Sequence, residues 1–98
     1  MIRAGKLIAP HPGEILEMII RENNLTQTKL ASHLGIPQTK ISEIIRGKRG
    51  LSAEMSMKLE KALGMKATLW MSIQKNWELA QVNKEKLRRI KLVENFAA

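Results

Sequence analysis

Apolar side chains recur along the chain at spacings of three and four residues, which is the period of an α-helix, and strand-like alternation is lacking. Five such stretches follow one another. Each begins at a residue that can cap or open a helix, namely Pro12, Thr26, Pro37, Ser52 and Thr68. The pattern predicts an all-α domain of five helices over residues 12–83. Residues 1–11 would form an N-terminal arm, and residues 84–98 a basic tail that is either a sixth helix or extended.

The break between the second and third helices is short and reads Gly35-Ile36-Pro37. Glycine suits a left-handed residue at the end of a helix, and proline gives up an N–H that the first helical turn leaves unpaired. Ala31 is small enough for two helices to approach closely, and Ile41 is spaced to enter the core between them. Two short helices joined in this way are typical of a helix-turn-helix.

The net charge of +8 indicates that the chain binds a polyanionic partner. Basic residues are concentrated at residues 46–49 and 84–91, and nucleic acid is the commonest polyanion that a small basic domain meets. The alternative is a basic surface that serves only solubility. The second helix of a helix-turn-helix lies in the DNA major groove, so its outward face is predicted to read bases.

A rotation of 100° per residue selects which side chains face outward from the third helix. Glutamine can bond adenine twice, threonine can touch the thymine methyl group, and glutamate can accept from cytosine. Base contacts are therefore expected from Gln38, Thr39, Ser42, Glu43 and Arg46. Phosphate contacts are expected from Gln27, Thr28, Lys40, Lys48 and Arg49. The alternative is an ordinary helical hairpin inside a bundle.

Other chemistry is sparse. The chain has no cysteine, and its two histidines, His11 and His33, are far apart without a carboxylate at ligand spacing. We expect capping or surface roles for them, no metal, no cofactor and no catalytic site. The chain also lacks an apolar run of membrane-spanning length and a signal-peptide pattern, so a cytoplasmic protein is expected.

A single helix-turn-helix reads few base pairs, so specificity normally needs two copies about one turn of DNA apart. The fifth helix, about residues 69–82, is predicted to join them. Its interface residues would be Leu69, Trp70, Ile73 and Trp77, with Trp70 exposed. In the alternative, this helix only completes the monomer core and dimers form on DNA. If the interface lies elsewhere, the tail after Asn83 is the next candidate.

Three motifs resemble, in order and spacing, the HigA-family antitoxins of bacterial toxin–antitoxin modules. They are "HPGEILEMII", "LTQTKLASHLGIPQTKISEIIRGKRGLSAEMSMKLEKALG" and "LWMSIQKNWELA", and they span about residues 10–82. The resemblance implies a lambda-repressor-like fold with a Cro/C1-type (XRE-like) helix-turn-helix. It also implies a homodimer that binds a palindromic operator in double-stranded DNA of its own promoter, and a partner toxin, HigB, which is an RNA-cleaving protein of the RelE type.

The resemblance assigns DNA contacts to Gln27, Gln38, Thr39, Ser42 and Glu43. Two positions depart from the family pattern: Pro37 stands where a small polar cap is usual, and Trp77 where tyrosine is frequent. Two other functions stay open. One is a solitary phage-like repressor without a toxin, and the other is a toxin-masking interaction module with weak DNA binding.

Overall fold

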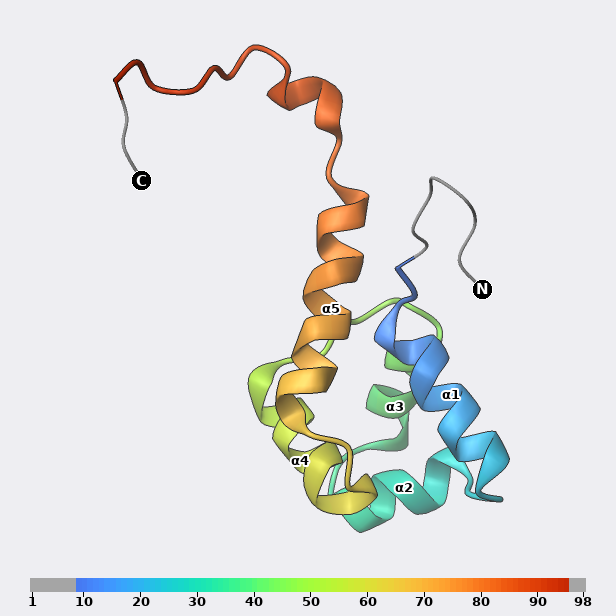
Figure 1. Cartoon of the computed structure of the whole chain (residues 1–98). Coiled ribbons are helices and arrows are strands. Elements are labelled where there is room, and N and C mark those ends of the chain that lie inside the picture. The colour runs from blue at the N-terminus through green and yellow to red at the C-terminus, as the bar shows by residue number, and fades with distance from the viewer. Residues whose placement is uncertain (1–8, 96–98) are drawn as a thin grey trace.

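Helices account for nearly all regular structure in the computed structural model, which describes residues 9–95 (Figure 1). Within that range there are five α-helices and one short 3-10 turn, and no strand. They are α1 (Pro12–Glu22), α2 (Gln27–Leu34), α3 (Gln38–Ile45), α4 (Ala53–Leu63), α5 (Ala67–Gln81) and η1 (Lys84–Leu87). The prediction of an all-α domain with five helices is confirmed.

Local sequence signals explain most of the helix ends. The Thr26 hydroxyl accepts from the Lys29 N–H at 3.0 Å, and the Ser52 hydroxyl accepts from the Met55 N–H at 3.1 Å, so both predicted N-caps are confirmed. Gly35 ends α2 at φ +71° and Gly64 ends α4 at φ +84°. Both are left-handed, a conformation that glycine adopts without steric cost.

The start of α5 differs from its prediction. Thr68 lies inside the first turn, because the helix begins at Ala67 with Lys66 at the N-cap position. The Ala67 N–H donates to a carboxylate oxygen of Glu60, on α4, at 2.8 Å. A side chain from the preceding helix therefore takes the role that we had expected of Thr68.

The core lies where α1, α2, α3, α4 and the first half of α5 meet. Its buried apolar side chains are Leu16, Ile20, Leu30, Ala31, Ile41, Ile44, Leu51, Met55, Leu59 and Trp70. Gly13 allows α1 to lie directly on the end of α3, since a Cβ there would overlap the carbonyl oxygen of Ile44. Trp70 has 0% of its surface exposed. Our prediction that Trp70 is an exposed interface residue was wrong, because the indole fills the centre of this core.

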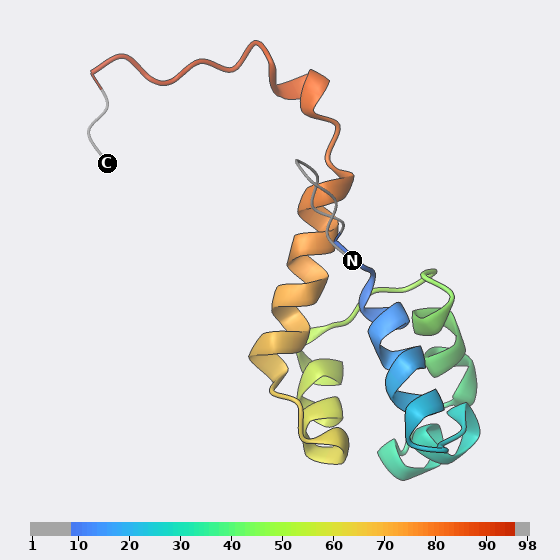
Figure 2. The ribbon, with the colours of Figure 1, turned by 45° about the vertical axis from the view of Figure 1, so that its right-hand side comes forward.

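The last part of the chain leaves the body of the domain. In Figures 1 and 2, α5 extends past the other helices, and the segment after it leads away from them. Every residue from Glu78 to Asn95 is exposed. Up to residue 95, the tail contains the single turn η1 and is otherwise irregular, so these residues do not form a sixth α-helix. No helix within residues 9–95 is long and apolar enough to cross a bilayer.

Candidate nucleic-acid interface

The turn between α2 and α3 is closed by backbone hydrogen bonds at its glycine. The Gly35 N–H donates to the Ser32 carbonyl at 3.2 Å, and the Ile36 N–H donates to the Ala31 carbonyl at 3.0 Å. Ala31 and Ile41 are buried on either side of this turn. The close helix approach predicted from these two residues is confirmed, and it fixes α3 as a short helix with one free face.

That free face carries the residues predicted to contact bases. Gln38, Thr39 and Arg46 are exposed, whereas Ser42 and Glu43 are half-buried. Ile41 and Ile44 are buried on the opposite side of α3. Of the predicted phosphate contacts, Thr28, Lys48 and Arg49 are exposed, and Gln27 and Lys40 are half-buried. Their contacts with DNA remain predictions.

The N-termini of α2 and α3 are joined by two glutamines. The side-chain amide of Gln38 donates to the side-chain oxygen of Gln27 at 2.9 Å. Sequence reasoning had placed Gln27 near a phosphate and Gln38 near a base without relating them. In the structure, each amide holds the other and keeps further donor and acceptor capacity for a ligand.

At the other end of α3, Glu43 pairs with Arg49. The Arg49 Nη2 and Nε atoms lie 2.8 Å and 2.9 Å from one Glu43 carboxylate oxygen. The backbone N–H groups of Lys48 and Arg49 also donate to the Glu43 carbonyl. The basic loop, defined here as residues 47–50, therefore folds back over the last turn of α3. Because the ion pair is half-exposed, it contributes about 1 kcal/mol or less, and a phosphate can compete for Arg49.

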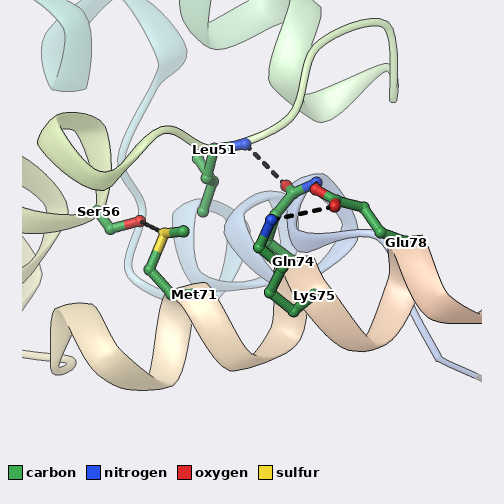
Figure 3. A network of polar contacts seen from close by, with 6 residues as sticks. All are labelled: Leu51, Ser56, Met71, Gln74, Lys75 and Glu78. Carbon is green, nitrogen blue, oxygen red and sulfur yellow. Dashed lines mark hydrogen bonds and ion pairs between the residues drawn. The ribbon is translucent and has the colours of Figure 1, made fainter.

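Gln74 on α5 holds the far end of the basic loop (Figure 3). Its side-chain oxygen accepts from the Leu51 N–H at 2.7 Å, and its amide nitrogen donates to Glu78 at 2.7 Å. Hydrogen bonds from Gln74 and Lys75 lower the pKa of the Glu78 carboxyl group. Sequence reasoning missed Gln74. Its position four residues after Trp70, on the inward stripe of α5, was the available signal.

His11 has the capping role predicted for it. Its ring Nδ1 accepts from the Gly13 N–H at 2.9 Å, and the Glu14 carboxylate accepts from the His11 N–H at 3.1 Å. The ring also contacts Trp77 edge-on, with centroids 4.8 Å apart. Burial lowers the pKa of His11, and the nearby Glu14 partly offsets this. Residues 9–95 contain no cluster of three ligand-type side chains that could hold a metal ion.

The predicted dimer residues divide into two groups. Trp70 is excluded by its burial, whereas Leu69 is 50% exposed and Ile73 and Trp77 are half-buried. Sequence reasoning did not single out Leu79 and Val82, which are also exposed at the end of α5. The exposed apolar surface therefore lies at both ends of α5, and the middle of the helix faces the core.

Comparisons with known proteins agree with this geometry. Residues 16–70 match the family described as "Helix-turn-helix". YddM, an uncharacterized HTH-type transcriptional regulator of Escherichia coli K12, is 31% identical over 85 residues, which cover 83% of this chain and 90% of YddM.

Two solved structures are similar over nearly the whole chain. The Pseudomonas aeruginosa antitoxin HigA, solved with the higBA promoter, has a TM-score of 0.79 at 27% identity, covering 91% of this chain and all of that one. A HigA-family addiction module antidote protein from Coxiella burnetii has a TM-score of 0.77 at 26% identity, covering 89% and 100%. These likenesses confirm the resemblance to HigA antitoxins, and the chain belongs to the helix-turn-helix family.

Proposed function

We propose that this chain is a homodimeric repressor that reads an operator in double-stranded DNA and also serves as the antitoxin of a HigB-type toxin. The observation that carries the DNA-binding part is the surface of α3. Polar side chains able to read base edges cover its free face, and a loop with Lys48 and Arg49 lies against its last turn. Similar proteins solved with promoter DNA support the same function.

The paired glutamines give this proposal a specific geometry. Gln38 stands at the first position of α3, the end of a recognition helix that contacts base edges. With one amide hydrogen donated to Gln27, Gln38 retains an oxygen and a second hydrogen, which match the N6 and N7 groups of adenine. Gln27, on the neighbouring helix, would then donate its own amide hydrogens to a phosphate while its oxygen holds Gln38 in place.

Binding measurements on two variants test the reading of bases. The wild-type chain would first select a duplex from a pool of random sequences, and a scrambled duplex would serve as the control. Gln38→Ala should cost about 1–3 kcal/mol on the selected duplex and little on the scrambled one. Lys48→Ala should weaken both and lower the salt slope by about one. Equal losses for Gln38→Ala on the two duplexes would remove Gln38 from base reading.

The dimer is proposed from the exposed apolar residues at the end of α5. Leu79 lies near the end of a helix that extends past the domain and Val82 directly follows that helix, so two copies could meet there without disturbing either core. A contact of this kind would be self-complementary about a two-fold axis and could set the spacing of two reading helices. The other candidates for the dimer interface are Leu69, Ile73 and Trp77. The buried Trp70 is no longer among them.

The likeness to HigA proteins supports a toxin partner. No contact within this chain bears on it. A net charge of +8 would repel a basic toxin, so shape and apolar contact would have to hold the complex. Co-expression with the neighbouring reading frame tests the idea, if that frame encodes a small RelE-like protein. Co-purification and loss of RNA cleavage would support the antitoxin role. A gene without such a neighbour would favour the solitary repressor.

A further inference from the structure

We propose that Gln74 is a positioning residue for DNA binding, which sets the basic loop against α3 although it contacts no DNA itself. The inference rests on the proposed function, because it assumes that Lys48 and Arg49 contact phosphates. It assigns to α5 a second role besides dimer formation. The helix that would join two copies also fixes the loop that would hold the DNA backbone.

The first observation is that the Gln74 amide is buried and used on both sides. Only 4% of the residue is exposed, and the oxygen and the nitrogen each make a hydrogen bond of 2.7 Å (Figure 3). The acceptor side reaches the backbone of Leu51, 23 residues earlier in the chain. A buried N–H without its acceptor costs about 1–3 kcal/mol, so this bond holds the chain at Leu51 firmly.

The second observation is that the same amide packs directly against the backbone of Gly50. A Cβ on Gly50 would lie 2.7–2.9 Å from three atoms of the Gln74 amide group, which is too close for real contacts. Gly47 has a positive φ, but Gly50 does not, so its backbone conformation does not require glycine. Space for the amide explains glycine at position 50.

The third observation is that the other end of the basic loop is held by α3. Two backbone N–H groups of the loop donate to the Glu43 carbonyl, and Arg49 pairs with the Glu43 carboxylate. The loop therefore spans from α3 to α5, with Gln74 as its buried anchor. If the amide is lost, the exposed loop can move outward so that water satisfies the Leu51 N–H. Lys48 and Arg49 would then be held from the α3 end alone and would no longer keep one fixed position beside α3.

Two variants separate this role from general stability. Gln74→Leu removes both hydrogen bonds at similar volume, and Glu78→Gln keeps an oxygen for the Gln74 amide and leaves the Leu51 bond intact. Affinity would be measured on the duplex selected by the wild-type chain, at several salt concentrations, below the melting temperature seen by circular dichroism. Gln74→Leu should weaken binding about tenfold and lower the salt slope by about one to two, since two cations are displaced. Glu78→Gln should change affinity by less than about twofold.

A double-mutant cycle gives a readout that a purely structural role would not change. Arg49→Ala should cost clearly less affinity in the Gln74→Leu background than in the wild type, because Arg49 is already displaced. Gln38→Ala, at the opposite end of α3, should cost the same in both backgrounds. Additive losses for Gln74 and Arg49 would overturn the proposal.

Gly50→Ala provides a second route if Gln74→Leu does not fold. It pushes the amide away without removing it, and it should lower the salt slope in the same way. An unchanged slope with Gly50→Ala would also overturn the proposal. If the wild-type chain enriches no duplex at all, the proposed function fails, which is a different outcome from a Gln74 variant that binds normally.

Discussion

The N-terminal half of the molecule, α1 to α3, and the C-terminal half of α5 with its tail are built in opposite ways. Helices α2 and α3 have eight residues each, and both turn their apolar residues into a shared core. From Glu78 onward, nothing is buried. Among the described residues, six of the nine exposed large apolar side chains lie at or after Leu79. Packing within one chain therefore accounts for α1 to α3, whereas the apolar side chains at the C-terminal end stay exposed within the described residues.

The boundary between the two regions runs through α5. Substitution of Trp70 should have the largest effect. Trp70→Ala should lower the free energy of unfolding by about 3–5 kcal/mol, because a large cavity opens in the core. Leu69→Ala, at a half-exposed neighbouring position, should cost about 1 kcal/mol or less. Denaturant unfolding of both variants measures the difference. Equal losses would mean that the N-terminal half of α5 does not belong to the core.

Trp70→Phe sharpens the same test. Within the described residues, the Trp70 indole N–H is buried without a hydrogen-bond partner. Phenylalanine removes this unsatisfied donor and keeps most of the ring, so Trp70→Phe should cost much less than Trp70→Ala.

Gly13→Ala should destabilise the N-terminal half at the contact between α1 and α3. The added Cβ would overlap the Ile44 carbonyl and force α1 away from α3, at a cost of about 3 kcal/mol. Gly64→Ala is the matched control, because its surroundings are open and only its positive φ is strained, at about 1 kcal/mol. Thermal melts of the two variants compare steric overlap with backbone strain. A smaller loss for Gly13→Ala than for Gly64→Ala would contradict the close approach.

Leu79→Glu should leave the fold intact and abolish the dimer. The side chain is 66% exposed, so the free energy of unfolding of the monomer should change by about 0.5 kcal/mol or less. A charge at the centre of an apolar contact should nevertheless separate the copies. Met57→Glu is the control, since Met57 is 63% exposed on α4, away from the C-terminal segment. Sedimentation in which Leu79→Glu stays dimeric would move the interface elsewhere.

The last prediction concerns how stability depends on pH through His11, at the start of α1. The pKa of His11 is lowered in the folded chain, so its contribution to stability is present above the ordinary value of about 6.5. It is lost as pH falls through the lowered value, because a protonated Nδ1 cannot accept from the Gly13 N–H. Between pH 7 and pH 5, the wild type should lose up to about 1 kcal/mol.

His11→Asn keeps a capping side chain that does not titrate in this range. The free energy of unfolding of this variant should therefore change less with pH than that of the wild type. An equal slope for wild type and His11→Asn would refute the assignment.

Features that depend on neighbouring residues in the sequence were predictable. Thr26, Ser52 and Gly35 act on backbone groups within a few residues, so their roles could be inferred without knowing the fold. The free face of α3 followed from the helical period alone. Such signals are local, and tertiary packing did not override them.

Features that depend on a distant partner were not predictable in the same way. Periodicity placed Trp70 on an apolar stripe but did not reveal that the core covers this part of the stripe. Thr68 was expected to cap α5 because nothing in the sequence near it indicated Glu60. The Gln74 anchor joins residues 23 positions apart, and only the fold brings them together. The contacts with DNA and the dimer remain predictions.

The carboxylate of Glu60 at the first turn of α5 limits how this chain can be divided. Within the described residues α5 has no capping hydrogen bond from the side chain of its own N-cap residue, and it takes one from the helix before it. An isolated peptide of α5 would therefore lose that cap, and its first turn would fray in water. Anyone wishing to transplant the C-terminal segment as an association module should carry residues 53–82, which are α4, α5 and the residue that ends α5. The unit that can be moved between proteins is a helical hairpin, and it is larger than the unit that would make the contact.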